Sequence, residues 1–305
     1  MLSGTDWRPL YPFSSRWLDL DGARYHYLDE GQGEPLLLVH GNPTWSFYWR
    51  QVIQHFAPRY RIVAIDHIGC GLSDKPRHYP YTLAQHVANL TRLVKHLDLR
   101  QVTLVGHDWG GAIGLGAAVA DSDRFARFVM LNTAAFRSSR MPWRIAACRI
   151  PMLGRLAVQG LNTFSRAATW MAVADRRRLS PAARAGLLAP YDRWSNRQAI
   201  WRFVADIPTS PAHPSYQTLY NIERKLPELA DRPWSLIWGM RDWCFTPEFL
   251  EKFQSFVPNA EVHRLENVGH WVVEEATDDV NGIIERFLAA HPLTLPNSEV
   301  TRAAR

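Results

Sequence analysis

A short apolar strand that runs into a glycine-rich turn constrains the fold of this 305-residue chain more than any other feature. Residues 102–105 read VTLV, and the hexapeptide GHDWGG at 106–111 follows, before a helical run of small residues. A continuously apolar strand is typical of a parallel sheet that is buried on both faces. The glycines let the chain turn sharply from strand to helix at Asp108. The motif therefore predicts that the Asp108 side chain stands at the edge of such a sheet.

The rest of the chain repeats this alternation of strands and helices. Strands are expected at residues 16–20, 23–28, 35–39, 61–65, 102–105, 128–131, 235–238 and 260–265. Helical periodicity fills the gaps at residues 45–56, 82–97, 110–120 and 278–289. Strands that alternate with helices predict an α/β fold, here a mostly parallel eight-stranded sheet with helices on both faces.

About a hundred residues between the fourth and fifth buried strands break this rhythm. They are rich in arginine and alanine, and helices are expected near residues 143–158 and 181–188. We interpret residues 133–225 as an inserted helical cap between two parts of a core, residues 1–132 and 226–305. The cap holds 15 Arg and Lys against four Asp and Glu, a net charge of +11, although the whole chain carries only +6. This charge indicates either a face toward an anionic partner or a solvated surface. It has no nucleic-acid-reading motif beside it, so no nucleic acid partner is expected.

The remaining composition favours a cytoplasmic protein without cofactor or metal. The N-terminus has no secretory apolar run, and no stretch approaches the length of a membrane span. Cys70, Cys148 and Cys244 are scattered without metal-ligand spacing and are expected to be free thiols. The first 15 residues and the tail after Pro292 are expected to be loosely held ends.

Asp108 occupies the central position of the nucleophile-elbow pattern G-x-S-x-G, where serine is usual. A carboxylate is already ionised, so it can displace a leaving group from carbon without first losing a proton. The alternative is an aspartate that only caps the following helix. The glycine frame favours the nucleophile.

Two further runs supply partners for Asp108. His40-Gly41-Asn42-Pro43 follows the strand at residues 35–39, where this kind of fold places an oxyanion-hole donor, so the backbone N–H groups of Asn42 and Trp109 are the expected donors. Their side-chain N–H groups can also hold a departing anion. Late in the chain, Gly269-His270 follows the last strand, which is the position of the general base in the order nucleophile, acid, histidine.

The acid that orients His270 has two candidate positions. Asp242 lies just beyond the strand at 235–238, whereas the rival position after the strand at 128–131 holds Asn132, which has no charge to stabilise an imidazolium. We therefore expect Asp242 to be the acid, the alternative being a turn residue. The glycine-rich run from Asp66 to Asp74 is interpreted as structural.

With these residues identified, the chain resembles the α/β-hydrolase superfamily over nearly its whole length. Its HGNPTW and DW strings are similar to the halide-binding pair of the haloalkane dehalogenases, and Asp242 with Asn42 matches their third subfamily. The strings NTAAFRSSRMPWRIAACRIPMLGRL, from Asn132, and WGMRDWCFTPEFL, from Trp238, look closest to the β-lactone decarboxylases of bacterial long-chain olefin biosynthesis.

This resemblance implies a cis-3,4-dialkyl β-lactone as substrate and a cis-alkene with CO2 as products. Asp108 is then expected to open the ring, either at the carbon bonded to oxygen or at the carbonyl. Haloalkane dehalogenase is the first alternative. Epoxide hydrolase is the second, and its proton donors are sought at Tyr191, Tyr216 and Tyr220. A catalytically inactive scaffold or receptor is the alternative outside enzymes.

A long-chain substrate suits an apolar cap. Six cap residues are candidate walls of an apolar channel, with the arginines between them facing outward: Trp143, Ile145, Ile150, Leu153, Leu156 and Val158. Ordinary packing of an amphipathic helix is the alternative. The basic surface of the cap is expected to meet either the partner enzymes of olefin biosynthesis or a lipid surface.

Overall fold

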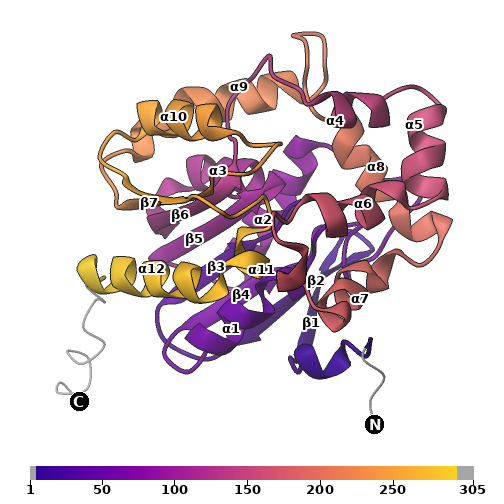
Figure 1. Ribbon diagram of the computed structural model, residues 1–305. Coiled ribbons are helices and arrows are strands. Elements are labelled where there is room, and N and C mark those ends of the chain that lie inside the picture. The colour runs from indigo at the N-terminus through magenta and orange to yellow at the C-terminus, as the bar shows by residue number, and fades with distance from the viewer. Residues whose placement is uncertain (1–4, 294–305) are drawn as a thin grey trace.

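The computed structural model describes residues 5–293 and contains one eight-stranded sheet (Figure 1). The strands are β1 (Ser15–Leu20), β2 (Ala23–Glu30), β3 (Pro35–Val39), β4 (Arg61–Ile65), β5 (Val102–Asp108), β6 (Phe125–Thr133), β7 (Trp234–Gly239) and β8 (Glu261–Leu265). Their order across the sheet is β1-β2-β4-β3-β5-β6-β7-β8. The pairs β1–β2 and β2–β4 are antiparallel, and all other neighbours are parallel. The predicted sheet is thus confirmed.

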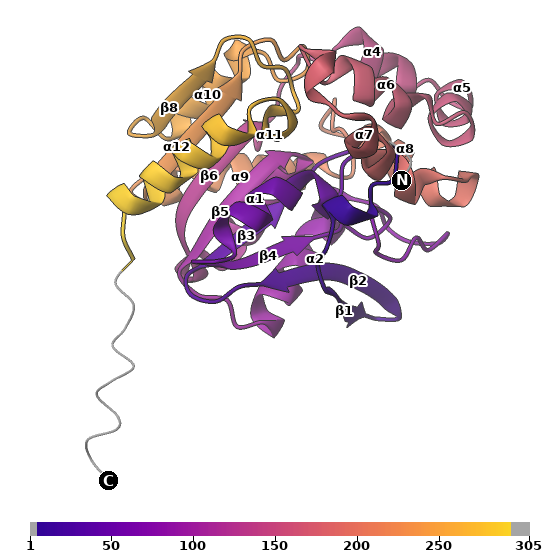
Figure 2. The same cartoon turned by 60° about the horizontal axis from the view of Figure 1, so that its bottom comes forward.

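Helices cover both faces of the sheet, as predicted (Figure 2). One face carries α1 (Arg50–Phe56) and α12 (Thr277–Ala290), which contact each other. The other carries α2 (Leu83–His96), α3 (Trp109–Ala120), α9 (Tyr216–Lys225) and α10 (Pro247–Phe256). Strands β3 and β5 are buried along their whole length because both faces are covered. The predicted alternation of strands and helices therefore correctly indicated a sheet that is apolar on both faces.

The inserted helical segment is also confirmed. Its α-helices are α4 (Trp143–Cys148), α5 (Leu153–Arg155), α6 (Thr163–Met171), α7 (Pro181–Leu188) and α8 (Gln198–Ala205). The expected helix at 143–158 is interrupted between α4 and α5, because Pro151 has no N–H to donate and Met152 has a positive φ of 59°. Helix α9 contacts α2 and α3 and so lies with the core helices. The boundaries at residues 133 and 225 stay a prediction.

The expectation of a loosely held N-terminus is wrong for residues 5–15. The Trp7 ring meets Trp45 edge-on at 5.8 Å, and the Tyr11 hydroxyl shares a 2.5 Å hydrogen bond with Ser46. These aromatic contacts bury apolar surface and hold the N-terminal segment against the core. The composition of the segment did not predict these contacts. The tail after Pro292 lies almost wholly outside the described residues. No helix within 5–293 is long and apolar enough to cross a membrane.

Candidate active site

Four of the five predicted site residues come from different strand ends at one edge of the sheet. Asp108 ends β5, and Asn42, Asp242 and His270 lie in the loops that follow β3, β7 and β8. Because β3, β5, β7 and β8 all run parallel in the sheet, their carboxyl ends open on the same side. The fifth residue, Trp109, is the first of helix α3. The sheet therefore brings together side chains that are up to 228 positions apart in the sequence.

Asp108 stands on a strained turn. Its φ of 53° and ψ of −127° are unusual for a residue with a side chain. The turn is fixed from two sides, since the Thr133 hydroxyl donates to the Asp108 carbonyl and Gly110 lies directly against β3. A Cβ atom at Gly110 would lie 2.0 Å from the Val39 carbonyl oxygen. A glycine is therefore required at position 110, because helix α3 packs closely on strand β3 there.

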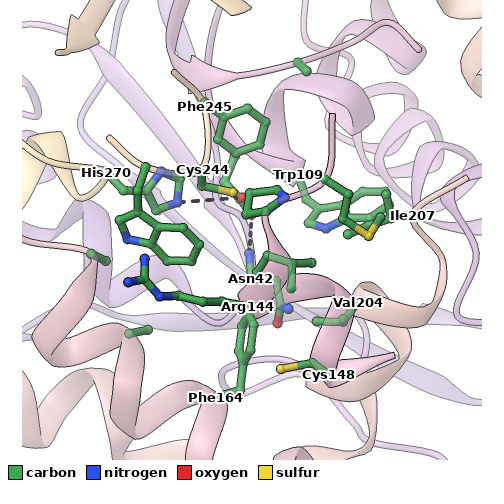
Figure 3. Close-up of a pocket in the computed structure, with 18 of the residues that line it drawn as sticks. Asn42, Trp109, Arg144, Cys148, Phe164, Val204, Ile207, Cys244, Phe245 and His270 are labelled. Carbon is green, nitrogen blue, oxygen red and sulfur yellow. Dashed lines mark hydrogen bonds and ion pairs between the residues drawn. The ribbon is translucent and has the colours of Figure 1, made fainter. Parts of the chain in front are cut away.

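The two carboxylate oxygens of Asp108 have different surroundings. The Asn42 backbone N–H donates to Oδ1 over 2.7 Å, and the Trp109 backbone N–H also bonds to this carboxylate. Oδ2 lies 3.7 Å from Nε2 of His270. In Figure 3 the dashed lines drawn from Asn42 and from the His270 ring mark these two contacts. Oδ1 is therefore held by the Asn42 amide, and Oδ2 faces the imidazole.

Burial and charge shift the titration of both groups. Burial raises the pKa of Asp108, and the neighbouring His270 and the amides of Asn42 and Trp109 oppose this rise without cancelling it. Burial disfavours the charged His270 ring, but the carboxylates of Asp242 and Asp108 outweigh it and raise the pKa of His270. Perturbed groups that face each other beside a cavity are typical of a catalytic site.

Asp242 meets the opposite nitrogen of the same ring. Its Oδ2 lies 2.7 Å from Nδ1 of His270, and its side chain is fully buried. The Cys244 backbone N–H donates to its Oδ1 over 2.6 Å. Nδ1–H of His270 thus points at a carboxylate, which leaves Nε2 toward Asp108.

The part played by Asn132 was not predicted from the sequence. Its side-chain amide donates to Asp242 Oδ2 over 2.9 Å and to the Gly239 carbonyl over 3.1 Å, and its own oxygen accepts from the Gly239 N–H over 2.7 Å. Asn132 therefore ties the acid-bearing loop to β6. Its position after the predicted strand 128–131 was noted, but only because an uncharged side chain there cannot stabilise an imidazolium.

Two other residues hold the histidine loop and had no assigned role. Glu275 accepts from the Gly269 N–H over 2.7 Å and from the Asp175 N–H, at the base of the cap, over 2.8 Å. His107 donates through Nε2 to the His270 carbonyl over 2.9 Å. The acidic pair Glu274-Glu275 after Gly269-His270 was the available signal for the first of these contacts.

A cavity of about 450 Å³ lies between these residues and the cap. Its wall includes Asn42, Asp108, Trp109 and His270 and many apolar side chains, among them Phe136, Phe164, Met171, Val204, Leu219, Phe245 and Phe249. The thiols of Cys148 and Cys244 also line it, and all three cysteines are free as predicted. A mostly apolar wall with a few polar groups at one end suits an apolar ligand with one reactive centre.

The predicted cap lining is corrected in part. Trp143 and Ile145 line the cavity, but three of the six candidates are exposed and do not: Ile150, Leu153 and Leu156. Val158 is buried away from it. The arginines do not all face outward, since Arg144 lines the cavity between the rings of Trp143 and Trp243. The break at Pro151 turns the second half of the expected helix away from the site.

The remaining predicted groups differ in their availability. The Asn42 side-chain N–H2 donates to the Ile200 carbonyl over 3.1 Å, which uses one of its two hydrogens. Among the contacts of residues 5–293, the Trp109 indole N–H has no acceptor, and its ring lines the cavity. Tyr191, Tyr216 and Tyr220 do not line it, because Tyr191 bonds to the Thr44 carbonyl and the other two lie against Arg137. The proton donors sought for an epoxide hydrolase are therefore not at the site.

Comparison with known proteins agrees with this geometry. The family described as alpha/beta hydrolase fold matches residues 34–277. Two proteins named cis-3-alkyl-4-alkyloxetan-2-one decarboxylase are similar to the chain. The one from Shewanella oneidensis is 40% identical, with 92% of this chain and 89% of the relative covered. The one from Xanthomonas campestris pv. campestris is 41% identical, with 93% and 99% covered.

Haloalkane dehalogenases are also similar, at lower identity. Haloalkane dehalogenase 2 of Mycobacterium tuberculosis is 35% identical, with 91% of this chain and 96% of the relative covered. The crystal structure of haloalkane dehalogenase DatA from Agrobacterium tumefaciens C58 has a TM-score of 0.81 at 27% identity, with 91% and 96% covered. The chain therefore belongs to the α/β-hydrolase fold family, within the haloalkane dehalogenase-like group that includes the alkyloxetanone decarboxylases.

Proposed function

We propose that the protein is a β-lactone decarboxylase that converts cis-3-alkyl-4-alkyloxetan-2-ones to cis-alkenes and CO2. The observation that carries this proposal is about 40% identity, over more than 90% of the chain, to two proteins named for that activity. We assign Asp108 as the nucleophile, and His270 with Asp242 as the imidazole–carboxylate pair. Asn42 and Trp109 supply the anion-binding donors. The apolar cavity supports two alkyl chains as substituents.

In the first step, Oδ2 of Asp108 attacks the ring carbon that is bonded to the ring oxygen. The carbon–oxygen bond breaks, and its electron pair leaves on the oxygen as a carboxylate, which relieves the strain of the four-membered ring. The product is an alkyl ester of Asp108 with a carboxylate on the neighbouring carbon. Oδ1 becomes the ester carbonyl oxygen and keeps its hydrogen bond to the backbone amide of Asn42.

In the second step, the bond between that neighbouring carbon and the carboxylate breaks, and CO2 leaves. Its electron pair forms the carbon–carbon double bond and expels the Asp108 carboxylate, so no water is consumed. Attack from behind inverts the first carbon, which places the ester oxygen opposite the carboxylate. Elimination of two opposite groups then keeps both alkyl chains on one side, as the cis-alkene requires.

Attack at the lactone carbonyl is the competing first step, and the site geometry favours it less. It would create an oxyanion on the substrate that needs donors of its own. The backbone N–H groups of Asn42 and Trp109 already bind the nucleophile itself. They are suited to an acyl oxygen that belongs to Asp108, as in an alkyl ester.

His270 is assigned an electrostatic role on this route. Its raised pKa favours the imidazolium, which lies beside Asp108 and lines the cavity where the new carboxylate appears. The cation stabilises that carboxylate during ring opening, and Asp242 stabilises the cation.

Haloalkane dehalogenase is the second candidate function, and it is favoured by the indole N–H of Trp109, which lines the cavity and has no acceptor within residues 5–293. Asp108 would displace a halide into the donors of Trp109 and Asn42. Neutral His270 would then activate water to attack the acyl carbon (Cγ) of the Asp108 ester. That hydrolysis needs the same Asn42 amide at Oδ1, so the geometry around Asp108 serves both reactions.

One experiment separates the two functions. Wild type and Asp108→Asn are each incubated with a long-chain cis-3,4-dialkyl β-lactone and, separately, with a long-chain 1-bromoalkane. Alkene is measured by gas chromatography and bromide by ion chromatography. We expect alkene from the lactone with wild type only. Bromide release without alkene formation, again abolished by Asp108→Asn, contradicts the proposal and supports the dehalogenase.

A further inference from the structure

The cap exposes a group of large apolar side chains, most of which do not line the active-site cavity. Within residues 5–293 ten large hydrophobic residues are exposed, and eight of them lie between Trp143 and Trp194. Met152 is 84% exposed, Leu153 68% and Leu161 66%. Soluble surfaces rarely gather such residues without a partner.

These residues share one side of the cap. Helix α5 contacts α4 and the turn at Leu156–Gly160, and that turn contacts α6. Figures 1 and 2 agree in placing α4, α5 and α6 together on the side of the molecule away from α12. We name the exposed side chains of this region the cap face: Trp143, Ile150, Met152, Leu153, Leu156 and Leu161.

The segment that carries the cap face has charges of a single sign. From Arg140 to Trp170 the sequence has five arginines and no acidic residue. Arg144 and Arg166 are exposed and form no ion pair with any residue between 5 and 293. A protein partner would have to supply both an apolar patch and several carboxylates. An anionic bilayer presents acyl chains and phosphate groups together.

The cap face is continuous with the mouth of the active-site cavity. Trp143 is 73% exposed and also lines the cavity, as does its exposed neighbour Arg144. A shallower hollow beside the mouth is lined by Arg144, Arg176, Trp170 and Trp243. Tryptophan and arginine are the residues that settle at the headgroup level of a bilayer. A lipid surface against this side would therefore lie at the cavity entrance.

The sequence indicates two candidate binding partners for the basic cap surface, namely partner enzymes and a lipid surface. We propose that the cap face docks on the surface of an anionic membrane and takes its apolar substrate from the lipid. The docking is peripheral, with the exposed side chains of α5 and the following turn entering the headgroup region. The uptake of substrate rests on the proposed lactone function, but the docking itself does not.

Docking is tested with the full chain and vesicles, without any substrate. Wild type is sedimented with sucrose-loaded vesicles of phosphatidylcholine alone or of phosphatidylcholine with phosphatidylglycerol, at low and at high salt. We expect binding to the anionic vesicles that weakens with salt. The double variant Leu153→Glu/Leu161→Glu should lower the bound fraction about tenfold or more, because charges must then enter the headgroup region. Arg166→Glu should lower binding to the anionic vesicles only.

Matched controls carry the same changes elsewhere. Trp17→Glu replaces an exposed apolar residue on the edge strand β1, and Arg264→Glu reverses an exposed charge on β8, so both should bind as wild type does. Hydrogen exchange on wild type, with and without anionic vesicles, needs no variant and should protect peptides covering residues 150–163. Thermal unfolding checks that each variant is folded.

Three results overturn the proposal. The first is that wild type sediments with neither vesicle type, the second is that the control variants lose binding as fully as the cap variants, and the third is that protection falls outside the cap. If sedimentation velocity without lipid instead shows an oligomer that Leu153→Glu/Leu161→Glu dissociates, and vesicles capture nothing, the cap face binds protein. Because no substrate is present, failure here is separate from failure of the lactone assay.

Discussion

The side-chain amide of Asn132 donates a 2.9 Å hydrogen bond to the carboxylate of Asp242, which in turn meets His270 at 2.7 Å. The two positions that competed for the role of acid in the sequence are therefore in contact, and Asn132 in β6 holds Asp242 in the loop after β7. Since Asn132 also exchanges hydrogen bonds with the backbone of Gly239, it fixes where the acid loop leaves β7. We assign it as a positioning residue.

Truncating Asn132 should lower turnover by displacing Asp242. A hydrogen bond to a charged group contributes about 1.5–3 kcal/mol, so Asn132→Ala should reduce kcat by roughly tenfold to a hundredfold. KM should change little, because Asn132 does not line the cavity. The matched control is Asn89→Ala, which removes another buried asparagine with side-chain bonds, remote from the site. Equal loss of kcat in both variants would show a general effect of destabilisation.

The sheet and the strand-end residues could be predicted because each leaves a local mark in the sequence. Continuous apolar runs mark β3 and β5, and a glycine frame marks Asp108. The role of Asn132 could not be predicted, because it depends on a contact across 110 positions of sequence. The cap lining failed for a related reason. A single break at Pro151 reorients everything after it, and periodicity alone does not give that direction.

Gly41 should tolerate no side chain, because it faces the nucleophile. A Cβ atom there would lie 2.1 Å from Oδ1 of Asp108, the oxygen held by the Asn42 amide. Gly41→Ala should therefore displace the carboxylate and reduce kcat by about a hundredfold or more, as misplacement by about 1 Å can do. Gly282→Ala on α12 is the control, since its Cβ would meet only the end of the Arg286 side chain, at 3.3 Å. Unchanged kcat in Gly41→Ala would contradict the assigned role of Oδ1.

Asp108 should cost the fold stability at neutral pH. Its pKa is raised by burial, so the folded state binds its proton more tightly than the unfolded state does, and stability falls as pH rises through that pKa. Asp108→Asn removes this cost and should raise the melting temperature by about 2–4 °C at pH 8. The gain in melting temperature should shrink as the pH is lowered and the Asp108 carboxyl of wild type becomes protonated.

The opposite sign is expected at Asp98, whose pKa is lowered by hydrogen bonds from Arg124 and Arg100. Its contribution is present above its unfolded pKa and is lost on acidification. Asp98→Asn should therefore lower the melting temperature at pH 8 and have less effect in acid. Scanning calorimetry across pH measures both variants. Parallel behaviour of the two would contradict the assignment of Asp108 as a buried, destabilising charge.

His270 should lose basicity when Asp108 loses its charge. The carboxylates of Asp242 and Asp108 both raise the pKa of His270 against the effect of burial, and only Asp242 remains in Asp108→Asn. Imidazole signals followed by NMR should therefore titrate at lower pH in that variant than in wild type. An unchanged His270 pKa would indicate that the two side chains do not sense each other.

The fate of the Asp108 oxygens should distinguish direct decarboxylation from hydrolysis. On the proposed route the second step breaks the bond between substrate carbon and Oδ2, so both oxygens return to the enzyme unchanged. In hydrolysis, water attacks the acyl carbon (Cγ) of the Asp108 ester, and the oxygen of that water stays in the Asp108 carboxylate. After turnover of the β-lactone in water enriched in oxygen-18, we expect mass spectrometry of the peptide containing Asp108 to show no added mass. A haloalkane turned over by hydrolysis should add one heavy oxygen, and Asp108→Asn should show no turnover-dependent label with either substrate. Label acquired during lactone turnover would mean that water resolves the intermediate, and the elimination step would have to be abandoned.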